Sequence, residues 1–120
     1  MKWLLDSNIV VLHLNGRLAD RLPEGEYFVS VITELETLSW PGLDDAAEQI
    51  LRTFLSNLTI VDLHEPIKRS AVAIRRQRLL KLPDAIVLAT ARSLGATLLT
   101  NDQRILQVES AGARSVILKT

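Results

Sequence analysis

Short apolar runs alternate with longer segments of helical spacing along most of the chain. The short runs are rich in β-prone residues and stop at polar ones, as expected of strands buried in a parallel sheet. Five strands are predicted, at residues 3–5, 27–32, 58–63, 97–100 and 115–118. The connections between them are too long for simple hairpins, which favours parallel pairing.

Helical spacing and capping signals predict six helices between these strands. Several begin at a capping residue or a proline, and Gly95 is suited to the left-handed conformation that ends a helix. The expected helices cover residues 7–14, 33–39, 46–55, 66–80, 84–94 and 104–108. Residues 17–25 are expected to form a linker with one helical turn.

This alternation indicates an α/β fold: a three-layer α/β/α sandwich with a mainly parallel central sheet. The 120 residues, 48% of them hydrophobic, fit one domain spanning 1–120. The chain has no cysteine, which fits a reducing compartment. Its N-terminus lacks the pattern of a signal peptide, and no apolar run approaches the roughly 20 residues that span a bilayer. We therefore expect a cytoplasmic protein with no membrane segment.

Acidic side chains follow three of the predicted strands, at the point where each strand ends. Asp6 follows the first strand, Glu34 and Glu36 follow the second, and Asp102 follows the strand at 97–100. Because the carboxyl ends of parallel strands share one edge of a sheet, we expect these side chains to lie close together. Asp84, in the first turn of its predicted helix, joins them if that helix begins at the same edge.

Helix capping explains two of these acids without any chemistry. Asp6 is a good N-cap for the helix that follows it. Thr33 and Glu36 match the S/T-x-x-E capping box, in which the glutamate reaches back to the backbone of the capping residue. Spacing along the helix also leaves open whether Glu34 or Glu36 faces the other acids.

Several carboxylates in one cleft raise each other's pKa unless a cation neutralises them. Mg²⁺ or Mn²⁺ takes such oxygen ligands and can promote in-line displacement at phosphorus by activating water. This chemistry needs no side-chain nucleophile. The sequence contains no P-loop, dinucleotide fingerprint or nucleophile elbow, and its two histidines lack metal-binding spacing.

Positive charge is concentrated in one segment, although 14 acidic and 14 basic residues balance over the whole chain. The segment from residue 68 to 81 carries Lys68, Arg69, Arg75, Arg76, Arg78 and Lys81. On charge alone, such a run is most often a solvated helix face. Beside an acidic metal cleft it would instead hold a polyanion, with Arg75, Arg76, Arg78 and Lys81 as the RNA-binding candidates.

Four segments together resemble the PIN-domain ribonucleases, and among them the VapC-like toxins of bacterial and archaeal toxin–antitoxin pairs. They are LLDSNI at 4–9, SVITELE at 30–36, LPDAIVLATA at 82–91 and LLTND at 98–102. The resemblance implies a PIN fold and endonucleolytic cleavage of RNA that depends on Mg²⁺ or Mn²⁺ and is blocked by a cognate antitoxin. It implies catalytic acids at Asp6, Glu36, Asp84 and Asp102, with the three aspartates binding metal and with Asn8 and Thr100 as polar supports.

The chain departs from the family pattern at Ser7, where Thr is frequent, and at Ile105, where an aromatic residue is common. Two other functions compete with a nuclease: a non-catalytic PIN-fold module that binds RNA or protein, and a phosphoreceiver-like signalling domain. The second expects paired acids after the first strand, whereas Asp6 has no acidic neighbour. Scattered apolar surface and two tryptophans also predict a homodimer.

Overall fold

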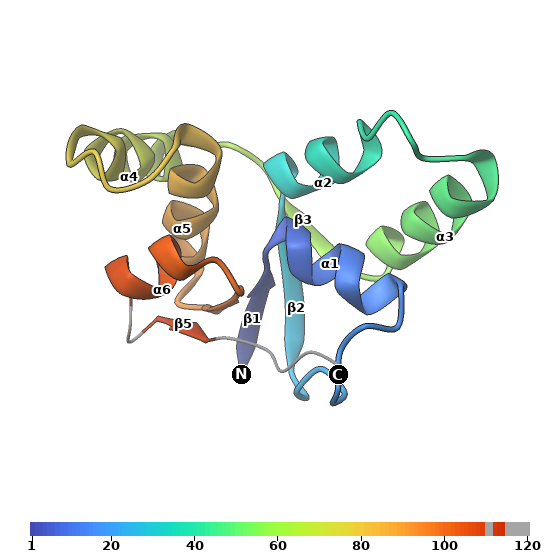
Figure 1. Ribbon diagram of the computed structural model, residues 1–120. Helices are drawn as coiled ribbons and strands as arrows, with labels where there is room; N and C mark the ends of the chain where they lie inside the picture. Colours follow the sequence, from blue (N-terminus) through green and yellow to red (C-terminus); the bar gives the residue numbers. More distant parts are fainter. Residues whose placement is uncertain (110–111, 115–120) are drawn as a thin grey trace.

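The computed structural model describes residues 1–109 and 112–114, in which five parallel strands form one sheet with helices on both faces (Figure 1). The predicted α/β sandwich is therefore confirmed. The strands are β1 (Lys2–Leu5), β2 (Glu26–Ser30), β3 (Thr59–Val61), β4 (Thr97–Leu99) and β5 (Ala113–Arg114). Their order across the sheet is β3-β2-β1-β4-β5, and every neighbouring pair is parallel.

Each predicted helix has a counterpart in the structure. They are α1 (Ser7–Leu14), α2 (Val31–Leu38), α3 (Asp45–Ser56), α4 (Glu65–Arg76), α5 (Leu82–Leu94) and α6 (Gln103–Val108). Gly95 closes α5 in the left-handed conformation, with a φ of 64°, as predicted. The helical turn expected within residues 17–25 is absent. The strand predicted at 115–118 lies outside the described residues.

Two predicted boundaries are wrong for identifiable reasons. Helix α4 stops at Arg76 rather than near Leu80, because the backbone enters the left-handed region at Arg78 with a φ of 59°. Leu80 is nevertheless buried, so its apolar character extended the helical pattern beyond the helix itself. Helix α2 begins earlier than predicted, since Ser30 ends β2 and also caps α2 by accepting a hydrogen bond from the Ile32 N–H.

The early start of α2 overturns the predicted capping box. Thr33 is a fully buried residue inside the helix rather than its N-cap. Glu36 lies further along the same helix and has no capping role. The capping-box explanation of Glu36 is therefore wrong.

Alternating strand residues divide the core between the two faces of the sheet. Leu4, Phe28 and Leu98 pack with residues of α4, α5 and α6 on one face. Trp3, Leu5, Val29 and Leu99 pack with residues of α1 and α3 on the other. Figure 1 shows these two helical layers on opposite sides of the strands. In the described part of the chain, none of the helices is long and apolar enough to span a membrane.

The strand order reverses direction between β1 and β4, which lie side by side although most of the chain separates them. In open α/β sheets, the crevice at such a reversal, beyond the carboxyl ends of the strands, is the usual ligand site. Helix α1 starts directly after β1, and α6 starts shortly after β4. The fold thus brings the N-termini of two helices to this crevice.

Candidate functional site

Asp6 and Asp102 are joined through the hydroxyl of Thr100 in the crevice between β1 and β4. The Thr100 Oγ1 donates to Asp6 Oδ2 at 2.6 Å and accepts from the Asp102 N–H at 3.0 Å. Asp6 Oδ1 also accepts from the Ser7 N–H at 2.9 Å. Thr100 is fully buried and Asp6 is 8% exposed, so these bonds hold the Asp6 carboxyl in one orientation.

Two of the acids cap helices. Asp6 is the N-cap of α1, as the capping explanation predicted. Asp102 is the N-cap of α6, where its Oδ1 accepts from the backbone N–H groups of Arg104 and Ile105. A helix N-terminus carries partial positive charge and stabilises a nearby carboxylate. Asp6 and Asp102 therefore cap helices and also belong to the acidic site.

Glu36 reaches the site from α2 through a residue that sequence reasoning missed. The Ser7 Oγ donates to Glu36 Oε1 at 2.8 Å and lies 3.4 Å from the Thr33 Oγ1. The sequence did contain a signal for Ser7. It is a hydroxyl residue directly after Asp6, at a position where the PIN-domain ribonucleases often have Thr. Glu34 instead borders a separate groove with Arg52 and Leu55, on the side of α3.

Asp84 lies in the first turn of α5, and its charge interacts with the other three acids. Burial raises the pKa of the Asp84 carboxyl above its usual value, and the charges of Asp102, Asp6 and Glu36 raise it further. The Lys81 ammonium acts in the opposite direction. Helix α5 therefore begins near the same crevice, as the prediction for Asp84 required.

The Asp6 carboxyl is subject to the same repulsion. Burial raises the pKa of Asp6, and the charges of Asp102 and Glu36 raise it further. The hydrogen bonds from Thr100 and the Ser7 N–H lower it but do not fully offset burial. Asp6 and Asp84 thus hold their charges at a cost in free energy that a nearby cation would relieve.

The donor chemistry of these four acids suits a hard divalent cation, because every candidate ligand atom is a carboxylate oxygen. In residues 1–109 and 112–114, however, no group of three Asp, Glu, His or Cys side chains is arranged so that it could hold a metal ion. The Asp6 oxygens are engaged with Thr100 and Ser7, and one Asp102 oxygen caps α6. Each carboxylate oxygen has two lone pairs, so these hydrogen bonds leave acceptor capacity for a cation, and metal binding would require the acidic side chains to move closer together.

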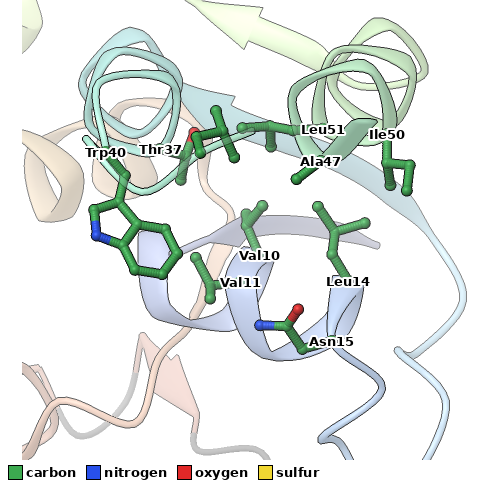
Figure 2. Close-up of a pocket in the computed structure, with 10 residues that line it drawn as sticks. Val10, Val11, Leu14, Asn15, Thr37, Trp40, Ala47, Ile50 and Leu51 are labelled. Carbon is green, nitrogen blue, oxygen red and sulfur yellow. The ribbon is translucent and has the colours of Figure 1, made fainter. Parts of the chain in front are cut away.

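An apolar groove between α1, α2 and α3 adjoins the acidic site. Figure 2 shows Val10, Val11 and Leu14 of α1 beneath Thr37, Trp40 and the α3 residues Ala47, Ile50 and Leu51. A second groove, lined by Ser7, Asn8 and Glu36, shares Val11, Thr37 and Trp40 with it. The two grooves therefore form one continuous surface that runs from the carboxylates to exposed apolar side chains.

The remaining predicted residues have different environments. Asn8 is exposed and borders the groove beside Glu36, and within the described residues its side chain bonds to none of the four acids. Of the basic candidates, Arg76 lies on the outer face of α4, whereas Arg78 borders a groove beside α6. Lys81 is the N-cap residue of α5 and is close enough to influence Asp84 electrostatically.

Several solved structures share this fold. A toxin–antitoxin complex from Klebsiella pneumoniae contains a chain 30% identical to this one, with a TM-score of 0.77 over 92% of this chain and 94% of that one. A chain of VapBC2 from Rickettsia felis, solved with a DNA fragment from the promoter, is 20% identical with a TM-score of 0.77 over 97% and 99% of the two chains. A chain of VapBC-1 from nontypeable Haemophilus influenzae is 18% identical with a TM-score of 0.72 over 96% and 98%.

The sequence also matches a described family over most of its length, although no curated protein matches the chain. The PIN domain family matches residues 3–110, a span that includes all four acids. This match and the likeness to VapBC complexes confirm the resemblance drawn from the sequence. The chain belongs to the PIN domain family.

Proposed function

We propose that this protein is a metal-dependent endoribonuclease and the toxin of a toxin–antitoxin pair, acting in the cytoplasm. The observation that carries the proposal is the grouping of Asp6, Glu36, Asp84 and Asp102 at the strand-order reversal, where the charges of neighbouring acids raise the pKa of Asp6 and of Asp84. Keeping Asp6 and Asp84 charged in this crevice is unfavourable, so a role that requires their negative charge accounts for them better than packing does.

Each acid has a distinct part in this proposal. Asp6, Asp84 and Asp102 hold Mg²⁺ or Mn²⁺, and Glu36 completes the catalytic set from α2. The cation, when bound, supplies an activated water and neutralises charge on the phosphate. Thr100 fixes the orientation of Asp6, and Ser7 fixes that of Glu36. Asn8 lies where it can contact substrate in the adjoining groove.

Cleavage of RNA by the purified protein tests the proposal. We expect cleavage with Mg²⁺ or Mn²⁺ and none in excess EDTA, with activity restored when the cation is returned. The Asp84→Asn variant should remain folded and fail to cut under all these conditions. Robust cleavage in EDTA, or full activity of Asp84→Asn, would contradict the proposal. Absence of cleavage of any RNA with either metal would favour a non-catalytic PIN module.

We assign the apolar groove between α1, α2 and α3 to the antitoxin. Trp40 and Ile50 border it and are 61% and 58% exposed, so two large exposed side chains flank one apolar groove, and exposed apolar patches of this kind mark interaction sites. The groove continues to Glu36, so a segment seated there covers the acidic site as well. The Klebsiella structure is itself a toxin–antitoxin complex, which supports a protein occupant over a small molecule.

The phosphoreceiver alternative is disfavoured by topology. Those domains have the strand order 2-1-3-4-5, whereas this chain has 3-2-1-4-5. The PIN domain match over residues 3–110 includes β2, β3, β4 and all of β1 except Lys2. A signalling role through phosphorylation of Asp6 therefore has no structural support.

A further inference from the structure

Another groove, of about 490 Å³, lies beside α6. The acidic site separates it from the apolar groove between α1, α2 and α3. The groove beside α6 is lined by Arg78, Leu79, Arg104, Gln107 and Val108. Its walls are the turn after α4 and the outer side of α6. Its volume falls within the roughly 300–1,000 Å³ of ordinary ligand pockets.

Each wall of this groove is connected to one acid of the site, one wall to Asp102 and the other to Asp84. On one wall, Arg104 is two residues from Asp102, and its backbone N–H donates to Asp102 Oδ1 at 2.9 Å. On the other, the turn that carries Arg78 leads directly to Lys81, whose charge acts on Asp84. A polyanion engaged at the acidic site therefore has a positively charged path beside it.

Both guanidinium groups are available to a ligand. Arg78 and Arg104 are exposed, and neither makes an ion pair in the part of the chain that the structure describes. The nearby carboxylate of Glu109 is paired with Arg92 at 2.5 Å. Arginine side chains that point into a groove without a partner carry charge that is free to contact phosphate.

The backbone at Arg78 gives independent support. Among the described residues, Arg78 is the one non-glycine residue with a positive φ, at 59°. The left-handed region costs a residue with a Cβ about 1–2 kcal/mol, a cost that glycine does not incur. An arginine at a position that favours glycine fits a requirement for its side chain, since such strain tends to occur at functional sites.

We propose that single-stranded RNA leaves the acidic site through this groove, with its backbone phosphates on Arg78 and Arg104. The inference rests on the proposed nuclease function and adds the path of the substrate. Leu79, which is 46% exposed, offers an apolar surface within the groove on which a base can lie. The contacts reach phosphate and an unpaired base, so the groove selects unpaired RNA rather than a particular sequence.

The outer face of α4 carries as much positive charge but is oriented differently. Lys68, Arg69 and Arg76 lie there, around Val72. This face is opposite Ile67, Ala71 and Ile74, which pack into the core between α4 and the rest of the domain. It therefore points away from the domain, and Arg69 serves as a charge-matched control for Arg78 and Arg104.

The test is binding of a fluorescein-labelled single-stranded RNA, measured by anisotropy in EDTA over a range of salt concentrations. Arg78→Gly and Arg104→Ala should each weaken binding several-fold and lower the salt-dependence slope by about 0.7, the value for one lost phosphate contact on a single strand. Arg69→Ala should leave both unchanged. Arg78→Gly should also keep or raise the melting temperature, because it relieves the left-handed strain.

The inference is overturned if Arg78→Gly and Arg104→Ala bind as the parent protein does, or if Arg69→Ala loses as much affinity as they do. Cleavage in Mn²⁺ separates this inference from the function on which it rests. A parent protein that cuts RNA, with groove variants that cut and bind equally well, contradicts only the path. A parent protein that cuts nothing, with groove variants that bind RNA less tightly, contradicts only the nuclease activity.

Discussion

Thr100 donates a 2.6 Å hydrogen bond to Asp6 across 94 positions of the sequence. This bond connects the end of β4 to the end of β1, so the two strands that flank the crevice also share one polar contact. Because Thr100 accepts from the Asp102 N–H at the same time, one buried hydroxyl positions two acids. The geometry of the site therefore depends on a residue that carries no charge.

A double-mutant cycle measures the strength of this link. Thr100→Val keeps the volume of the side chain but leaves Asp6 Oδ2 and the Asp102 N–H without their partner. Each buried group left unpaired costs about 1–3 kcal/mol of unfolding free energy. When Thr100→Val is combined with Asp6→Asn, we expect a coupling energy of about 0.5–3 kcal/mol from urea denaturation. Strictly additive losses would show that the two side chains do not interact.

Removing the Asp84 charge should stabilise the metal-free protein at neutral pH. The pKa of Asp84 is raised in the folded state above its usual 3.8, so the folded protein binds this proton more tightly than the unfolded chain does. Stability from this group is thus fully present below pH 3.8 and is lost as the pH rises through the folded-state pKa. Asp84→Asn escapes that loss, and its melting temperature in EDTA at pH 7 should be equal to or above that of the parent.

The matched control for Asp84→Asn is Asp45→Asn, which alters the first turn of α3 far from the crevice. Losing a favourable helix-end charge there should lower stability slightly. Added Mn²⁺ should raise the melting temperature of the parent and of the Asp45 variant, and have much less effect on the Asp84 variant. A clear drop in the stability of metal-free Asp84→Asn would mean that the carboxylate serves the helix rather than the site.

Glu36 and Glu34 should respond differently to loss of charge. Glu36 lies at 2.8 Å from the Ser7 Oγ beside Asp6, whereas Glu34 borders the groove with Arg52. Glu36→Gln should weaken Mn²⁺ affinity and RNA cleavage by about 10-fold or more, by analogy with changes around metal ligands. Glu34→Gln should change neither. An active Glu36 variant beside an inactive Glu34 variant would reverse the assignment.

Substitution of two exposed apolar residues tests whether the apolar groove between α1, α2 and α3 binds the antitoxin. Ile50→Ser should weaken association with the cognate antitoxin by roughly 10-fold, the equivalent of 1.4 kcal/mol. Val72, which is 47% exposed on the outer face of α4, is the control. Equal affinities of the Ile50→Ser and Val72→Ser variants in calorimetry would exclude this groove as the interface.

We also expect a homodimer, which light scattering at micromolar concentration will show directly. Of the two tryptophans, Trp3 is only 3% exposed, so its large apolar surface serves the core. Trp40 borders the apolar groove assigned to the antitoxin, so other exposed apolar residues such as Leu35, which is 55% exposed, remain for the homodimer. A strictly monomeric protein at that concentration would contradict the expectation.

The strand ends predicted most of the acidic site. Asp6 directly follows one apolar strand-like run and Asp102 follows another after a short polar link, so parallel pairing places both acids at one edge of the sheet. The position of Asp84 does not follow from the strand ends, because no strand closely precedes its helix. Its location depends on where α5 packs, which is a tertiary property that the local sequence does not encode.

The predicted boundaries of α2 and α4 were wrong where two local sequence patterns overlapped. The S/T-x-x-E spacing at Thr33 and Glu36 matches a capping box, but Ser30 is also a good cap and ends the strand first. Leu80 continues the apolar spacing of α4 although the backbone has already turned at Arg78. The basic run marked Arg78 as an RNA-binding candidate, but nothing in the sequence joined Arg104 to it, because the two residues are far apart in the chain and line one groove only when α6 packs beside the turn.

The pairing of β1 with β4 also determines when, during synthesis of the chain, the proposed site can first form. A ribosome that has released β1, β2 and β3 has exposed Asp6 and Glu36, but Thr100 and Asp102 do not yet exist as part of the chain. The proposed site is therefore incomplete while only the first three strands have been made, and it forms when β4 inserts beside β1.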